Sequence, residues 1–200
     1  QGWLSDMGGI YTLGIQPLTV IRGNVIHNVA ADEGEGGYGG WGIYLDEGSS
    51  GILVEKNLAY FCGSNGFHQH YGRENIVRNN IFALNSEGQV RVSRKEEHIS
   101  AIFTSNIVVG DNSPMFCSVE NGKFEDENNL YWDYTRSAFV LSSSSDRIKL
   151  SNRLYKCEMT LKGFYKEAVF RDPWFRNAKS ADFTLALNSP ALKTGFEPWN

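Results

Sequence analysis

Three acidic side chains near the start of the chain have the chemistry that acid–base catalysis needs. Asp6 precedes two glycines in the segment DMGG, and Asp46 and Glu47 follow an apolar run in the segment GIYLDEG. Hydrolysis of a glycosidic bond requires two carboxyl groups that flank the bond, one as the acid and one as the nucleophile or base. Asp46, Asp6 and Glu47 are therefore candidate catalytic residues, although an Asp beside glycine also caps turns.

Aromatic, histidine and arginine side chains recur in segments that resemble those holding the acids. The segments are GIYTLG, GGWGIYLDEG, GFHQH and QVRVS, and the candidate substrate-binding residues in them are Tyr11, Trp41, Tyr44, His68, His70 and Arg91. Apolar sugar faces stack on aromatic rings, and sugar hydroxyls form hydrogen bonds with histidine, arginine and carboxylates. This set is typical of a sugar-binding cleft, whereas a solvated face would carry Lys, Glu, Ser and Thr.

The two histidines and Arg91 each allow more than one role. His68 and His70 could hold a metal ion only with a third ligand, for which Asp46 is the clear candidate, so we expect no metal and no cofactor. The histidines could instead bind substrate, tune the pKa of Asp46, or lie on the surface without a function. Arg91 lies in the charged stretch RVSRKEEH, which fits either a solvated rim of self-paired charges or a contact to an acidic or hydroxylated sugar.

A glycine-rich stretch over residues 34–42 contains Tyr38 and Trp41. No helix is expected after it, so it does not fit a phosphate-binding loop. Either it is a plain flexible loop, or it is a mobile lip that carries aromatic rings toward a sugar subsite.

These residues can act together only if the fold brings them together, and a repeat predicts that it does. An Asn followed by an apolar pair recurs with spacings of 33, 23, 26 and 23 residues, at Asn24, Asn57, Asn80, Asn106 and Asn129. A second column is spaced 33, 24 and 23 residues apart, at Ile10, Ile43, Phe67 and Val90. Both columns are long only in their first interval, which indicates an insertion over residues 30–40. A period near 24 without helical patterning predicts a solenoid of β-strands.

Because the two columns keep nearly the same spacings, they favour an all-β fold, a single-stranded right-handed parallel β-helix, over an antiparallel β-domain. Successive side chains of a strand point to opposite faces, so an inward Ile43 column places Tyr11, Tyr44, His68 and Arg91 outward. The same alternation places Asp46 and His70 in the next outward column and Gln69 inside, where Gln69 would need partners. The expected core contains Ile43, Leu45, Val54, Leu58, Phe67, Ile76, Ile81, Val90, Ile102 and Ile107.

The chain divides into three parts by pattern. Residues 1–133 carry the repeat and begin abruptly, as if they belonged to a longer parent β-helix. Residues 134–165 are expected to form a loop excursion with a short helix near 158–167, and residues 166–200 a closing segment over the last turn. The net charge of −4 indicates no nucleic-acid partner, and the lack of a run of about 18 apolar residues indicates no membrane span. Cys62, Cys117 and Cys157 are expected to be buried free thiols.

The segments DMGGIYTLG, GGWGIYLDEGSS, GFHQHYGREN and RNNIFA resemble right-handed parallel β-helix proteins of the pectin-lyase-like superfamily, from bacteria that degrade plant polysaccharide. They are most similar to the glycoside hydrolase branch that includes α-L-fucosidase and xylanase activities. The endings DPWF, DFTL and SPALKTG are similar to the closing segment of such proteins.

This resemblance implies a secreted or periplasmic bacterial protein that acts on a polysaccharide or oligosaccharide. It also implies that the acids of DMGG and LDEG, which are Asp6 and Asp46, form the catalytic pair. Because the same fold carries other activities, two alternatives remain open. One is a polysaccharide lyase, with His70, Arg91 and Asp46 in the active site and a possible Ca²⁺ ion. The other is a carbohydrate-binding module without catalysis.

Overall fold

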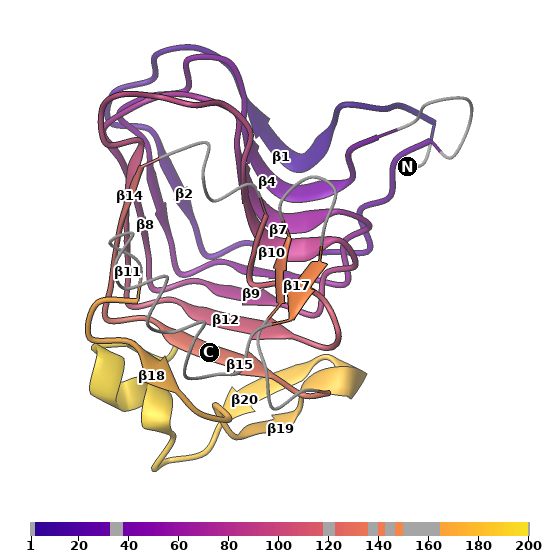
Figure 1. The fold of residues 1–200 in the computed structure, drawn as a ribbon, viewed down its shortest axis with the longest axis vertical. Coiled ribbons are helices and arrows are strands. Elements are labelled where there is room, and N and C mark those ends of the chain that lie inside the picture. The colour runs from indigo at the N-terminus through magenta and orange to yellow at the C-terminus, as the bar shows by residue number, and fades with distance from the viewer. Residues whose placement is uncertain are drawn as a thin grey trace.

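The computed structural model describes residues 3–32, 38–117, 123–135, 140–142, 147–149 and 165–199. They form a solenoid of parallel β-strands in which a turn contributes one short strand to each of three sheets (Figure 1). The fold is therefore the all-β, right-handed parallel β-helix that the repeat predicts.

The first sheet carries the candidate site. Its strands, in order, are β1 (Gly8–Thr12), β4 (Trp41–Leu45), β7 (Asn65–Gln69), β10 (Gly88–Val92), β13 (Phe116–Cys117), β16 (Val140–Ser142) and β17 (Arg147–Lys149). The second sheet contains β14 (Phe124–Glu127), β11 (Ala101–Thr104), β8 (Asn75–Arg78), β5 (Leu53–Glu55) and β2 (Val20–Arg22). The third contains β18 (Val169–Phe170), β15 (Leu130–Asp133), β12 (Ile107–Gly110), β9 (Ile81–Ala83), β6 (Leu58–Tyr60) and β3 (Val25–His27).

The strand register confirms the column of apolar residues and the insertion. Ile10 pairs with Ile43, Ile43 with Phe67, and Phe67 with Val90. Strand β1 pairs directly with β4, so the extra residues between β3 and β4 do not disturb the register of the solenoid. A glycine precedes three of these four residues, Ile10, Ile43 and Phe67, and close packing explains it: a Cβ atom on Gly42 would lie 2.5 Å from the carbonyl oxygen of Gly66.

A ladder of asparagine side chains joins the turns. The Nδ2 group of Asn57 donates to Oδ1 of Asn80 at 3.0 Å, and Nδ2 of Asn80 donates to Oδ1 of Asn106 at 3.0 Å. Asn24 and Asn129 continue the ladder at 2.9 Å and 3.1 Å. Each acceptor oxygen also takes the backbone N–H of the preceding asparagine, as Asn80 does from Asn57 at 3.0 Å. The asparagines thus satisfy buried backbone groups at the bend between the second and third sheets.

The left-handed backbone position at this bend is one residue earlier than the asparagine itself. Lys56, Asn79, Ser105 and Asn128 have φ values of 55°, 55°, 55° and 56°. A left-handed conformation is unfavourable for residues other than glycine and is retained where surrounding contacts fix it. The ladder asparagines therefore act through their side-chain amides, while their predecessors make the turn.

The interior is apolar with a few satisfied polar groups. Gln69 is fully buried, donates to the carbonyl oxygens of Gly72 and Ser100 at 3.2 Å each, and accepts from Asn75. Two members of the expected core are wrong, because Ile76 and Ile102 are 37% and 40% exposed. They lie on the outer face of the second sheet, and their strand neighbours point inward instead. Leu58 is only partly buried.

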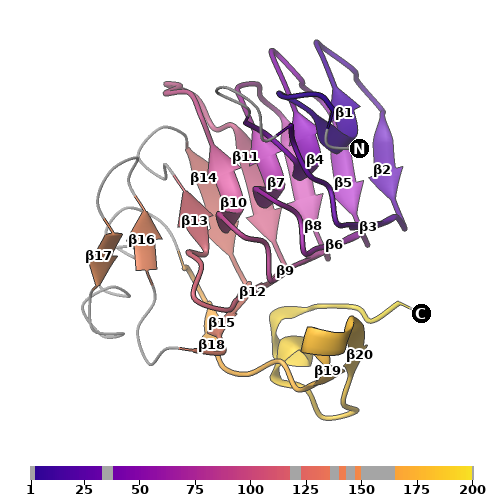
Figure 2. The same ribbon diagram turned by 90° about the vertical axis from the view of Figure 1, so that its right-hand side faces the viewer.

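The closing segment packs mainly on the side of the solenoid rather than over its last turn. It contains β19 (Phe175–Asn177), a 3-10 helix η1 (Ala178–Ser180), β20 (Asp182–Leu185) and a second 3-10 helix η2 (Pro190–Thr194). Figure 2 shows these elements beside the third sheet. Phe183, Ala191 and Phe196 join the outward side chains Ile81 and Ile107 in a second apolar cluster. This cluster, and not the interior, buries these two isoleucines.

The excursion after the last full turn is only partly described. Strand β16 pairs in parallel with β13, and β17 pairs with β16 in antiparallel fashion. Part of this stretch therefore extends the first sheet instead of forming a loop. Most of the helix expected near 158–167 falls outside the described residues, as does Cys157. Cys62 and Cys117 are buried free thiols, as expected.

We predict that Asn80→Ala lowers the free energy of unfolding by about 2–4 kcal/mol, because it leaves the Asn57 amide and the Val54 carbonyl without their partners in the interior. Urea denaturation followed by circular dichroism measures the change. Asn188→Ala, at an exposed position, is the matched control and should change stability by less than about 0.5 kcal/mol. Equal effects in the two variants would contradict a structural role for the ladder.

Candidate functional site

The outer face of the first sheet holds the predicted site residues. Tyr11 pairs with Tyr44, Tyr44 with His68, and His68 with Arg91, one on each of β1, β4, β7 and β10. Their strand neighbours Ile43, Phe67 and Val90 belong to the interior apolar cluster. The predicted face assignment is therefore confirmed, since Tyr44 and His68 point away from the interior.

This face is more tightly packed than the sequence predicts. The rings of Tyr44 and His68 stack with centroids 4.5 Å apart at an interplanar angle of 3°, and Trp41 lies 4.4 Å from each of them. Tyr44 and His68 are each only 2% exposed. Parallel stacking of turns roughly 4.8 Å apart brings successive rings into contact, and this contact excludes water. The open part of the surface consists of Asp6 and Tyr11, together with Tyr38 and Glu47.

Two of the three candidate acids share one phenolic hydroxyl. The Tyr44 hydroxyl lies 2.8 Å from Oδ1 of Asp46 and 3.3 Å from Oδ1 of Asp6. The hydroxyl of Tyr11 donates to Oδ2 of Asp46. The two Oδ1 atoms therefore cannot be more than about 6 Å apart, so both carboxyl groups can approach one glycosidic bond.

The hydrogen bonds set the charge of Asp46. Burial by itself raises the pKa of this carboxyl group, but the bonds from Tyr11 and Tyr44, with His70 nearby, lower it overall. The hydrogen bond to Asp46 is the main cause that raises the pKa of Tyr11, and burial is the main cause for Tyr44. At neutral pH the carboxylate is thus ionised, and the two phenols keep their protons.

Tyr38 is a member of the site that the sequence did not identify as a binding residue. A hydrogen bond to Asp6 raises the pKa of its hydroxyl, and its carbonyl oxygen accepts the backbone N–H of Asp6 at 2.8 Å. Its ring contacts Trp41 at a centroid distance of 6.1 Å. The described end of the glycine-rich insertion therefore lies against the acid pair. Residues 33–37 fall outside the described residues, and the expected mobility of this lip stays a prediction.

Around His68, three buried nitrogen atoms have no hydrogen-bond partner among the described residues. They are Nδ1 of His68, Nε1 of Trp41 and Nε of Arg91. Nε2 of His68 bonds to the hydroxyl of Ser93. Burial, with the positive charge of Arg91 nearby, holds the pKa of His68 well below its ordinary value, so the ring is neutral. Unpaired buried polar atoms are uncommon and often mark a binding surface.

The remaining candidates lie at the rim of this face. Arg91 forms an ion pair with Glu87 at 3.6 Å, which agrees with the interpretation of self-paired charges. His70 accepts a hydrogen bond from Nε of Arg94 at 3.1 Å. Glu47 is exposed and forms no side-chain hydrogen bond or ion pair with the residues that the structure describes. Within those residues, no group of three His, Cys, Asp or Glu side chains could hold a metal ion.

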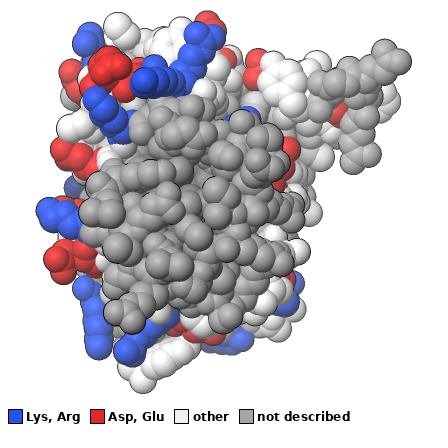
Figure 3. Space-filling model, in the orientation of Figure 1, with Lys and Arg blue, Asp and Glu red and all other residues white. Residues whose placement is uncertain are grey.

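Charged side chains of both signs mix along the edge of the molecule near β14 in Figure 3, and the described surface in that view has no large patch of one sign. No helix among the described residues is long and apolar enough to cross a membrane. No family model matches the chain, and neither does any curated protein or solved structure. The protein is thus defined as a parallel β-helix, and its chemistry has to be argued from the site.

We predict that Tyr44→Phe raises the pKa of Asp46, because it removes one of the two phenolic donors that stabilise the carboxylate. Carbon-13 NMR of the carboxyl groups during a pH titration measures the change. In the parent protein the lowered pKa contributes stability above the unfolded-state pKa, and this stability is lost as the pH falls through the folded-state pKa. The variant should therefore lose less stability on acidification.

Tyr71→Phe is the matched control for this experiment. Tyr71 packs against the ring of His70 at 5.2 Å on the same face, but its hydroxyl does not bond to Asp46. The pKa of Asp46 should be the same in this variant and in the parent. An unchanged pKa in Tyr44→Phe as well would show that this hydroxyl does not stabilise the carboxylate.

Proposed function

We propose that this protein is a glycoside hydrolase in which Asp46 and Asp6 are the two catalytic carboxyl groups. The observation that supports the proposal is their common contact to the hydroxyl of Tyr44, which brings two acids from different turns close together, as a pair of carboxyl groups flanking one glycosidic bond must be. The likeness of the DMGG and LDEG segments to β-helix hydrolases supports the same pair. A bacterial, secreted or periplasmic protein fits this proposal and rests on the likeness alone.

The two acids differ in environment, and this difference suggests their roles. Asp46 is 6% exposed and carries a lowered pKa, so it suits the nucleophile or base, which must be ionised. Asp6 is the exposed member of the pair, and in this proposal it takes the remaining role, the acid that protonates the leaving oxygen. The sugar would approach from the open side, where Tyr11 is 46% and Tyr38 55% exposed. Their rings offer faces for sugar stacking.

Incubation with a panel of neutral and uronate-containing plant polysaccharides tests the proposal. A hydrolase releases new reducing ends without ultraviolet absorbance, which is the expected result. A lyase would release an unsaturated product that absorbs in the ultraviolet. A binding module would retain polysaccharide in a pull-down without releasing any product. Either of the last two outcomes would contradict the proposed reaction.

We predict that Asp46→Asn lowers turnover at least roughly a thousandfold, because an amide can neither attack the anomeric carbon nor accept a proton from an attacking water. The loss of stability should be about 1–2 kcal/mol, since one of the two tyrosine hydroxyls loses its acceptor. Turnover and urea denaturation are measured on the same preparation. Glu125→Gln, at an exposed position on β14 outside the site, is the control. Turnover within about tenfold of the parent in Asp46→Asn would make Asp46 a structural residue.

We predict retention of configuration at the anomeric carbon, because the shared Tyr44 hydroxyl keeps the two carboxyl groups close together. Retaining enzymes place their carboxyl groups about 5–5.5 Å apart, so that one of them attacks the sugar directly. Proton NMR of the first product, recorded before mutarotation, measures its configuration. An inverted product would mean that water, and not Asp46, attacks the sugar.

A further inference from the structure

A second column of side chains runs along the outer face of the second sheet. The acid pair lies at the first sheet, so the two groups of residues are on different faces of the solenoid. Strand pairing aligns Arg22 with Glu55, Glu55 with Arg78, Arg78 with Thr104, and Thr104 with Glu127. The charges alternate in sign from Arg22 to Arg78 and are interrupted by the neutral Thr104. Stacked turns lie roughly 4.8 Å apart, so each side chain in the column faces its neighbours closely.

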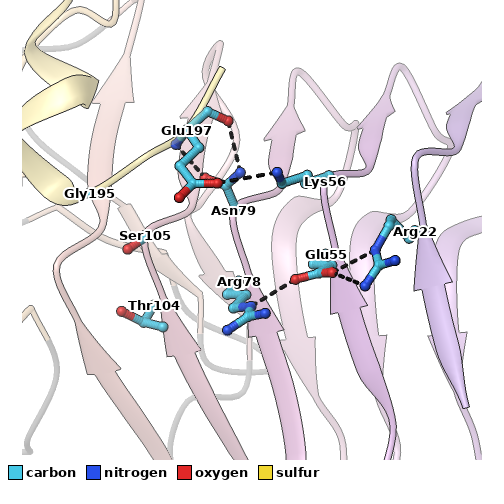
Figure 4. Close-up of a pocket in the computed structure, with 9 residues that line it drawn as sticks. All are labelled: Arg22, Glu55, Lys56, Arg78, Asn79, Thr104, Ser105, Gly195 and Glu197. Atoms are coloured by element: carbon cyan, nitrogen blue, oxygen red, sulfur yellow. Dashed lines mark hydrogen bonds and ion pairs between the residues drawn. The ribbon is translucent and has the colours of Figure 1, made fainter. Parts of the chain in front are cut away.

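Glu55 fixes the two arginines above and below it. It is 5% exposed and accepts from Nε of Arg22 at 2.6 Å and from Nε of Arg78 at 2.8 Å, so both of its oxygens are used (Figure 4). Burial raises the pKa of Glu55, but the bonds from Arg78 and Arg22 lower it overall, so the carboxylate is ionised. An arginine that a buried carboxylate holds through Nε is pre-oriented to present its other nitrogens to a ligand.

The other side of Arg78 lacks the negative charge that the alternation would supply. The next residue in the column, Thr104, is short and neutral, and Figure 4 shows it and Ser105 beside the Arg78 guanidinium. The two terminal nitrogens of Arg78 make no hydrogen bond to any described residue other than Glu55. A position for one anion is thus left open between Arg78 and the level of Thr104.

A cavity of about 560 Å³ lies at this position. The closing segment forms its far wall, where Asn79 and Glu197 exchange two hydrogen bonds of 2.8 Å and 2.7 Å, and Ser105 donates to the carbonyl oxygen of Thr194 at 2.8 Å. Lys56 pairs with Glu197 at 3.2 Å. The lining therefore holds three cations against two carboxylates, a surplus of one positive charge.

We propose that this cavity binds the carboxylate of a hydroxylated organic acid, of which a uronic acid is the simplest case. The planar guanidinium of Arg78 matches a planar carboxylate, and a surplus of one charge suits a monoanion better than a phosphate dianion. The hydroxyl group of Thr104, and the second N–H of the Asn79 amide beside the one bonded to Glu197, offer partners to the hydroxyl groups of the acid. The cavity is larger than a bare anion needs and lies in the size range of small-molecule sites. It is separate from the proposed catalytic face and does not depend on that activity.

Calorimetric titration with sodium glucuronate at low ionic strength tests this proposal, with glucose and inorganic phosphate as comparison ligands. We expect glucuronate to bind and glucose, which has the same skeleton without the carboxylate, to bind at least tenfold more weakly. Glucose binding as tightly as glucuronate, or no binding of either, would overturn the proposal. Phosphate binding as tightly as glucuronate would overturn the assignment to a carboxylate. A trimer of uronic acid is a further ligand. If the trimer binds more tightly than glucuronate, the site accepts a polymer; if it does not, the site accepts the free acid. Either result supports the class of ligand.

The variant Thr104→Glu provides the sharpest test, because it places a tethered carboxylate where the column lacks one. It should reduce glucuronate affinity at least tenfold and change the thermal midpoint little, since attraction to Arg78 on one side opposes repulsion from Glu127 on the other, where Lys166 already pairs with Glu127. Ser180→Glu adds the same charge at an exposed position outside the cavity and should bind glucuronate as the parent does. Arg78→Gln should also lose binding. Parent-like affinity in Thr104→Glu would overturn the proposal even if Arg78→Gln fails to fold.

Discussion

The structure depends on the in-register stacking of turns, and the buried asparagine ladder is what fixes that register. Each ladder amide accepts both the backbone N–H and the side-chain amide of the preceding asparagine, as Asn106 does from Asn80 at 2.9 and 3.0 Å. A slip of one residue would leave these groups unpaired in an apolar interior, which costs far more than the hydrogen bonds contribute when made. All the other columns, aromatic and charged alike, inherit their alignment from this one.

In-register stacking also creates a difficulty, because side chains at equivalent positions of successive turns lie close to one another and must be compatible. The chain meets it in three ways: planar rings stack at Tyr44 and His68, charges alternate at Glu55 and Arg78, and amides bond head to tail. The ladder ends at Asp126, which accepts from Asn129 at 2.6 Å. Burial raises the pKa of Asp126 to about 6, so this carboxylate reduces stability as the pH rises from the unfolded-state value toward 6.

The sequence was sufficient to predict the features that the repeat itself determines. The column containing Ile43 and Phe67, the outward placement of Tyr44 and His68, and the need of Gln69 for partners all follow from period and alternation. Features set by non-repeating segments could not be predicted. The contact of Tyr38 with Asp6 comes from an insertion without a counterpart in other turns. The closing segment packs on the side of the solenoid and buries Ile81, and Ile76 faces outward. To predict either feature, one must know which residues of each sheet point inward, and the repeat does not give this for all three sheets.

The proposed acid pair combines these two kinds of structure. Asp46 belongs to a stacked strand, and the tyrosines of two adjacent turns hold its carboxylate. Asp6 precedes the first strand in a left-handed conformation, with φ of 52°, and its backbone N–H is bonded to the carbonyl oxygen of Tyr38 in the insertion. The solenoid thus fixes the buried carboxylate, while the insertion sets the position of the exposed one.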